Sequence, residues 1–217
     1  MFLGHFGAAL AAKPLAPQAS LGTLFLAAQF IDLLWPTLLL LGVERVRLAP
    51  GITTVTPLDF EHYPVSHSLV AVVGWAVLLG VAYAASRRSL RGALVVGALV
   101  VSHWLLDLVV HRPDLPLYSG SARYGFGLWQ SLPWTLAVEV SIFAGGLWLY
   151  LRATRAIDAT GKWALWSLAA FLLLVYLGNL FGPPPENVVQ IAVAGHAQWL
   201  LVLWGYWIDR HRGQFGL

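Results

Sequence analysis

The sequence contains no cysteine and little charge, and both absences restrict what the chain can be. Without cysteine it has no disulfide, thiolate metal ligand or Cys nucleophile, so any metal must be held by nitrogen and oxygen atoms. Only 11% of its 217 residues are charged while 59% are hydrophobic, and the mean hydropathy is +0.72. Such a chain has too little polar surface to cover a soluble globule of its size. The composition therefore predicts an integral membrane protein.

Dense basic stretches and internal repeats are missing as well. The net charge of +3 comes from Arg residues scattered between apolar runs, so no nucleic-acid partner is expected. Without a repeat, a single helical domain over residues 1–217 is the simplest organisation. The 11 Trp and 7 Tyr suit the aromatic belts of membrane interfaces, because their rings are apolar in body and polar at one tip.

Long apolar runs dominate the chain, and a membrane span needs ~20 mostly apolar residues. Runs of this length cover about residues 20–42, 67–86, 92–111, 132–152, 163–182 and 188–208. Residues 2–12 are apolar but shorter, which predicts a half-span or an interfacial helix. A cleaved signal peptide is the alternative, but Lys13 follows the apolar stretch and no positive charge precedes it. We expect an all-α, polytopic membrane protein of about six transmembrane helices plus a short N-terminal helix.

Basic residues gather in alternate loops, and this pattern predicts the orientation of the spans. The basic loops contain Arg87, Arg88, Arg91, Arg152, Arg155, Lys162, Arg210 and Arg212. By the positive-inside rule these loops are cytoplasmic, and the loops at 43–66, 112–131 and 183–187 lie outside. Four arginines run against this rule, although acidic residues lie near them in the sequence: Arg45, Arg47, Arg112 and Arg123.

Several ionisable residues fall within the apolar runs. They are His5, Asp32, His67, His103 and Asp107, with Glu139 and His196 further along. A charged group near the bilayer centre costs on the order of 2.5–3.5 kcal/mol, so such residues usually face a site or a cavity. At ~1.5 Å per residue from the basic loops, the first five fall in the outer half of the membrane, except His5, which falls near the middle. Convergence of these side chains on one site is therefore expected.

The strongest local pattern is His103-Trp-Leu-Leu-Asp107. Residues at i and i+4 share a helical face with Cβ atoms about 5–6 Å apart, so the imidazole and the carboxylate can bind one cation. A hydrogen bond between two buried polar groups is an equally good interpretation of this pair alone. A second element runs from Glu61 to Ser68, where Ser66 is a natural N-cap that would place His67 in the first turn of the next span. His62 in the same stretch is either a ligand or a solvated loop histidine.

The number of candidate ligands bears on the metal. Six residues are candidates: His5, Asp32, His62, His67, His103 and Asp107. This is more than a tetrahedral zinc uses, which indicates two metal ions, or one ion with residues left over around it. Nitrogen and oxygen donors fit zinc, with manganese or iron as alternatives. Outside this set, we expect Glu139 to pair with His196 or to be protonated, His196 to be a satisfied interior histidine, and His111 to mark a helix C-terminus.

Four short motifs in their order resemble bacterial inner-membrane metal-dependent hydrolases named after the LexA-associated membrane protein. The matching segments are Gly4-His5-Phe6-Gly7-Ala8, Ile31-Asp32, His62-Tyr-Pro-Val-Ser-His67-Ser68 and Ser102-His103-Trp-Leu-Leu-Asp107. The likeness covers residues 1–111, and residues 112–217 match only in being hydrophobic. Gln29-Phe30 stands where the family has Pro-Asp, and Tyr63-Pro64 where it has Arg-Gly, which removes a carboxylate and a cation. The family in turn resembles zinc-dependent phospholipase C.

This resemblance implies a metal site more strongly than a substrate. The leading hypothesis is a hydrolase of the inner membrane in which a divalent metal activates water against an ester or phosphoester, with Asp32 and His67 in catalytic roles. A lipid or lipid-linked phosphoester fits a site on the non-cytoplasmic side, so membrane lipids are the expected partners. A metal-ion or proton transporter is one alternative, and it predicts polar groups on both sides of the midplane. A non-catalytic scaffold with a structural metal site is the other.

Overall fold

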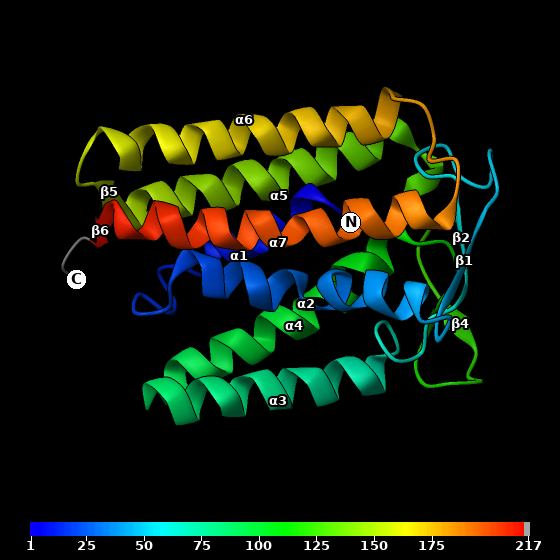
Figure 1. The fold of residues 1–217 in the computed structure, drawn as a ribbon, viewed down its shortest axis with the longest axis horizontal. Helices are drawn as coiled ribbons and strands as arrows, with labels where there is room; N and C mark the ends of the chain where they lie inside the picture. The colour runs from blue at the N-terminus through cyan, green and yellow to red at the C-terminus, as the bar shows by residue number, and fades with distance from the viewer. Residues whose placement is uncertain (215–217) are drawn as a thin grey trace.

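The computed structural model describes residues 1–214, most of them in long helices that run alongside one another (Figure 1). The helices are α1 (Leu3–Ala11), α2 (Leu21–Leu40), α3 (Leu69–Arg87), α4 (Leu90–Val110), α5 (Leu132–Ala153), α6 (Ala159–Phe181) and α7 (Val188–Arg210), with a 3-10 turn η1 (Leu128–Gln130). Six of them, α2 to α7, are long and apolar enough to cross a membrane. The predicted all-α, polytopic membrane fold is confirmed.

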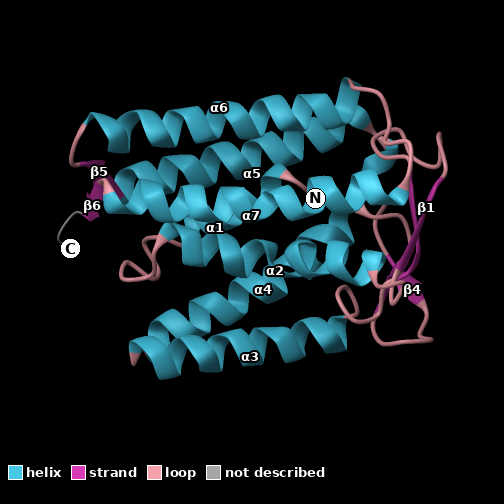
Figure 2. Cartoon of the chain, viewed as in Figure 1, coloured by secondary structure: helices cyan, strands magenta, loops and turns pink. Residues whose placement is uncertain are grey.

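Short strands lie at the two ends of the bundle (Figure 2). At one end, β1 (Arg45–Leu48) pairs with β2 (Leu58–His62), and β3 (Leu115–Pro116) pairs with β4 (Arg123–Tyr124). We call this the hairpin end. At the other end, β5 (Thr154–Ala156) pairs with β6 (Arg212–Gln214), and we call it the basic end because the basic loops of the sequence lie there. Val46 and Phe60 face inward across the first pair, and each is 7% exposed, so the hairpin covers the bundle.

The short helix α1 lies at the centre of the bundle, which favours a half-span over an interfacial helix. It packs against α2, α4 and α5. Leu3, Phe6 and Leu10 are almost completely buried. Glu139 of α5 accepts hydrogen bonds from the backbone N–H groups of Phe2 and Gly4, at 2.8 and 3.4 Å. A helix that begins inside the bundle needs such an acceptor, because its first N–H groups have no partner in the helix.

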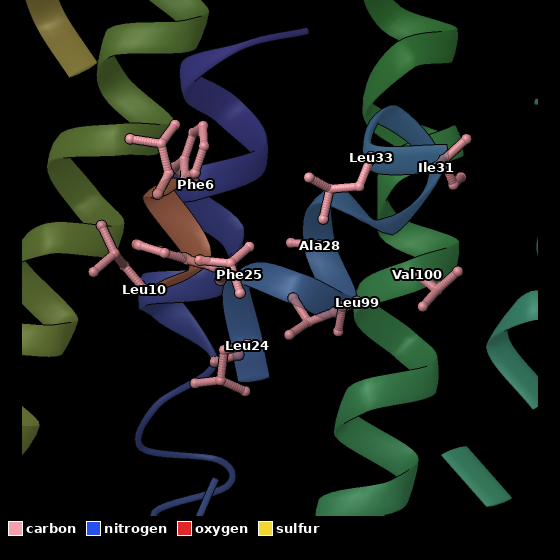
Figure 3. Close-up of a cluster of buried hydrophobic side chains, with 14 of the residues drawn as sticks. Phe6, Leu10, Leu24, Phe25, Ala28, Ile31, Leu33, Leu99 and Val100 are labelled. Atoms are coloured by element: carbon pink, nitrogen blue, oxygen red, sulfur yellow. The ribbon is translucent and has the colours of Figure 1, made fainter. Parts of the chain in front are cut away.

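Buried apolar side chains of α1, α2 and α4 pack against one another in a layer within the bundle (Figure 3). Phe6 and Leu10 supply it from α1, Leu24, Phe25 and Ala28 from α2, and Leu99 and Val100 from α4. These side chains are 5% exposed or less. Because His5, Asp32 and His103 follow this layer toward the hairpin end, it forms a floor beneath them.

Close contact between α1 and α5 depends on two glycines. A Cβ atom on Gly146 would overlap the backbone of Gly7, and one on Gly7 would overlap the backbone of Ile142 and Phe143. Small residues of this kind let membrane helices approach to backbone contact. The neighbouring Gly145 has nothing within 4 Å of its Cβ position.

We therefore predict that Gly146→Ala destabilises the protein by about 1–3 kcal/mol, as overpacking in a tight interface does. Thermal unfolding in one detergent, followed by circular dichroism, measures the effect. Gly145→Ala is the matched control, and it should leave the melting temperature unchanged or raise it, because alanine favours helix more than glycine does. Equal melting temperatures for the two variants would contradict the predicted contact.

Candidate metal centre

Five of the six predicted ligands meet at the hairpin-end half of the bundle, from four segments of the chain. They are His5 of α1, Asp32 of α2, His67 in the loop before α3, and His103 and Asp107 of α4. They form two groups of three donors, His5–His103–Asp107 and Asp32–His67–His103, and the donor atoms of each group lie within 4.8 Å of one another. Since His103 belongs to both, the groups make one cluster. This buried His/Asp cluster could hold a metal ion.

Four distances between imidazole nitrogens and carboxylate oxygens in the cluster are close to those between the ligands of a metal ion. His67 Nε2 lies 3.4 Å from Asp32 Oδ1 and 3.8 Å from Asp107 Oδ2. His103 Nε2 lies 3.6 Å from Asp32 Oδ1 and 3.2 Å from Asp107 Oδ2. With metal–ligand bonds of about 2.0–2.1 Å, the edges of a tetrahedron are about 3.3 Å long. Each of these two imidazoles therefore lies near both carboxylates at a spacing compatible with a shared metal ion.

The tautomer of His103 is fixed by a backbone carbonyl. Its Nδ1 lies 2.7 Å from the carbonyl oxygen of Ala28, so Nδ1–H donates and Nε2 keeps its lone pair. That Nε2 atom is buried and has no hydrogen-bond partner among the described residues. Metal-binding histidines commonly donate their other N–H in this way.

His67 is oriented by a chain of two side chains. Ser66 Oγ lies 2.6 Å from Glu44 Oε2 and 2.6 Å from His67 Nδ1. The serine hydroxyl has one proton, which goes to the carboxylate, so it accepts the proton of Nδ1–H. Glu44 is itself 1% exposed and also accepts the backbone N–H of Val65 and Ser66, both at 2.8 Å. Again Nε2 is left free and faces the cluster.

The two oxygens of Asp107 have different partners. Oδ1 lies beside the amino group of Met1 and 3.1 Å from His5 Nε2, while Oδ2 faces His67 and His103. His5 stacks on His103 with ring centroids 3.6 Å apart. His5 therefore contacts both His103 and Asp107, and it holds the carboxylate from the side away from Asp32.

A proline interrupts the helical hydrogen bonds of α2 next to Asp32. Pro36 lies four residues after Asp32 within α2, and it has no N–H to donate to the Asp32 carbonyl. Asp32 is the most accessible member of the cluster, with its side chain 26% exposed, whereas those of His67, His103 and Asp107 are 3% exposed or less. The cluster is thus open on the side of Asp32.

Three details of the sequence interpretation differ from the structure. His62 lies on β2 opposite Arg45, lines a separate pocket with Tyr63 and Pro64, and belongs to neither donor group. The N-cap before α3 is Ser68, whose Oγ accepts from Ala71 N at 3.3 Å, so His67 precedes the helix rather than lying in its first turn. The expectation for Ser66 was wrong because either serine can cap, and Ser66 is already engaged by Glu44.

Glu139 and His196 do not pair. Glu139 accepts the backbone N–H groups at the start of α1, while His196 contacts Thr37 Oγ1 at 3.0 Å and the carbonyl of Ala192 at 2.8 Å. The expectation that His196 is a satisfied interior histidine agrees with these contacts.

His111 borders the cluster, although the sequence gave it little weight. Its Nε2 lies 4.0 Å from Asp107 Oδ2, and its Nδ1 lies 2.8 Å from Asp114 Oδ1. The Tyr63 hydroxyl donates to the same Asp114 oxygen at 3.0 Å, and burial followed by the nearby Asp114 charge raises the pKa of Tyr63 well above its usual range. The spacing of His111 from Asp107, again i and i+4, is the signal in the sequence that points to it.

A cavity of about 490 Å³ opens from the cluster. Asp32, His67, Asp107 and His111 line one part of it, and residues of α6, α7 and the hairpin-end loops line the rest. Comparison of the chain with models of protein families, with curated proteins and with solved structures finds no match. The resemblance to the LexA-associated membrane hydrolases therefore stays a prediction.

We predict that the protein purified without chelator contains a transition metal, and that His103→Ala loses most of it because two donor groups share this imidazole. Elemental analysis of detergent-purified protein gives the metal-to-protein ratio. His196→Ala is the control, since His196 is also a histidine within a span but has protein partners on both nitrogens. Equal metal content in the wild type and in His103→Ala would count against the centre.

Ser66→Ala tests the orientation of His67 separately from its presence. Loss of a group that orients a ligand typically lowers metal affinity about 10–100-fold, so a drop in this range is expected in competition with a chromogenic chelator. Ser102→Ala, which removes a hydroxyl next to His103 that bonds only within its own helix, should bind as the wild type does. An unchanged affinity in Ser66→Ala would show that the serine does not position the imidazole.

Proposed function

We propose that the protein is a metal-dependent hydrolase of the membrane that cleaves an ester or phosphoester. The observation that carries this proposal is the set of three buried donors, His67, His103 and Asp107, beside the more accessible Asp32, which borders a cavity. Structural metal sites are usually closed by protein ligands, whereas catalytic ones keep a position for water or substrate.

The residues present fit a divalent metal. The donors are two imidazole nitrogens and two carboxylate oxygens, which suit zinc and also manganese or iron. His103 Nε2 is buried without a hydrogen-bond partner within residues 1–214. Because buried polar atoms are normally paired, this nitrogen is a candidate metal ligand. Asp32, His67, His103 and Asp107 would hold the ion, and His5 would support Asp107 and His103 from behind. A metal bound there supplies Lewis acidity and makes water a stronger nucleophile.

Asp32 and His67 are the two cluster residues to which we assign roles in the reaction. Asp32 borders the cavity, where it can accept a hydrogen bond from a water and aim that water at the substrate. His67, fixed through Ser66 and Glu44, keeps the donor set in place while substrate exchanges. Hydrolysis adds water across the ester: the water oxygen bonds to phosphorus or to the carbonyl carbon, the bond from that atom to the leaving oxygen breaks, and the leaving oxygen takes up a proton that the water gives up.

The apolar floor favours an enzyme over a transporter. Phe6, Leu24 and Phe25 are completely buried in this layer, so a wet path across the bundle would have to pass apolar side chains, with the buried Gln29 as a polar residue next to them. We further propose that the basic end is cytoplasmic and that the cluster lies on the non-cytoplasmic side of a bacterial inner membrane, in keeping with the distribution of Arg and Lys.

The test is hydrolysis by the purified protein loaded with zinc, manganese or iron, on a chromogenic phosphodiester and on a chromogenic carboxylic ester. We expect turnover that a chelator removes and that added metal restores, with at least a 100-fold lower kcat for Asp32→Asn because the open side loses its carboxylate. His196→Gln, outside the cluster, should retain activity. Metal-loaded protein without turnover on either ester class, together with ion flux into proteoliposomes, would instead support the transporter.

A further inference from the structure

Helices α6 and α7 contact each other in the basic-end half of the bundle, and a cavity lies between them in the hairpin-end half. Toward the basic end, Trp204 of α7 donates to the carbonyl of Ala164 of α6 at 3.1 Å, and its ring lies 5.7 Å from that of Phe171. Toward the hairpin end, residues of both helices line the cavity instead. From α6 these are Tyr176, Asn179 and Leu180, and from α7 they include Ile191, Ala194 and Gln198. The cavity therefore occupies the space between the two helices in that half.

This space joins the candidate metal centre to the lipid-facing surface of the bundle. Both helices are candidate membrane spans, and Leu177 and Val193 beside the cavity are 45% and 62% exposed. Leu180, Ile191 and Ala194 give the passage apolar walls. Exposed apolar side chains on these two candidate spans face hydrocarbon in a bilayer, so a molecule that enters between them comes from the lipid.

Polar atoms without partners lie along the same cavity. Trp35 is 8% exposed and Tyr176 is 3% exposed, and both line the cavity. The Nε1–H of Trp35 and the hydroxyl of Tyr176 have no hydrogen-bond partner in the described part of the chain. Buried donors of this kind are normally paired, so they indicate an occupant with acceptor oxygens.

The charge of the walls limits what that occupant is. Asp32, Asp107 and Glu139 line the cavity, its lining residues within 1–214 include no Lys or Arg, and the amino group of Met1, which also lines it, is already paired with Asp107. A headgroup with two negative charges would meet carboxylates without a compensating basic side chain. A phosphodiester, with one negative charge, or a neutral carboxylic ester is better matched to this lining.

We infer that the passage between the hairpin-end halves of α6 and α7 admits a membrane lipid, with its ester group at the cluster and one alkyl chain between Leu180 and Ala194. As a statement about substrate, this inference rests on the proposed hydrolase function. As a statement about binding, it stands apart from catalysis, since the passage is formed without the metal ligands.

The experiment blocks the passage with a tryptophan side chain placed on one helix or on the other. Ala194→Trp adds an indole on α7, and Leu180→Trp adds one on α6. Val193→Trp is the matched control, because Val193 is next to Ala194, is 62% exposed and does not line the cavity. Native mass spectrometry of each purified protein, titrated with dioleoyl phosphatidylglycerol in detergent, reports the lipid retained. We expect one tightly retained lipid in the wild type and in Val193→Trp, and at least tenfold weaker retention in both wall variants.

Thermal unfolding shows whether each variant is folded, and two wall variants on different helices guard against one that is not. The inference is overturned if both folded wall variants retain the lipid as tightly as the wild type does, or if the wild type retains no lipid. The ratio of kcat/KM for dioleoyl over dibutyryl phosphatidylglycerol provides the second measurement, and it should fall at least tenfold in the wall variants. An unchanged ratio also overturns the inference.

The same preparations separate this inference from the proposed function. Retained lipid that the wall variants lose, in a protein that has no metal and no turnover, would support the passage and reject the hydrolase. Metal-dependent turnover whose chain-length ratio is indifferent to the wall variants would support the hydrolase and reject the passage.

Discussion

The negative charge of the buried Asp107 carboxylate brings together several segments in the hairpin-end half of this protein. A charge deep in a bilayer costs on the order of 2.5–3.5 kcal/mol, and the Asp107 side chain is only 2% exposed. Its Oδ1 is met by the amino group of Met1 and by His5, and its Oδ2 by His67 and His103. These partners come from α1, from the loop before α3 and from α4 itself. The groups that stabilise the charge therefore also hold α1 at the centre of the bundle. Glu139 accepts a hydrogen bond from the backbone N–H of Phe2 at the start of this helix.

The fold was predictable from the sequence, because span length and composition are local properties, and the six apolar runs became six candidate spans. The His103–Asp107 pair was predictable for the same reason, since helical spacing alone places both on one face. The groups that orient the ligands were not. The Ala28 carbonyl has no signature in the sequence, and Glu44 meets Ser66 only because the chain returns through the β1–β2 hairpin. Whether His62 points inward depends on the strand register, which changes at an irregularity between Arg45 and Val46.

Three of the four arginines at the hairpin end that run against the positive-inside rule have partners in the structure. Arg47 pairs with Asp59 and Glu61, Arg112 pairs with Asp59 and Asp114, and Arg123 donates to the backbone carbonyls of Phe60 and Glu61. Asp114 in turn holds His111, so this network reaches the edge of the candidate metal centre. Arg47, Arg112 and Arg123 therefore have structural roles at the hairpin end.

The two halves of the chain contribute differently to the site. All donor atoms of the cluster come from residues 1–111, which is also where the family-like motifs occur. Residues 112–214 supply the cap on α1 and the α6 and α7 walls of the cavity. A ligand set tolerates few substitutions, because each donor must match the geometry of one ion. A wall needs only apolar side chains of suitable size, which many sequences provide. Residues 1–111 therefore supply the chemistry of the cluster, and residues 112–214 set the shape of the space beside it.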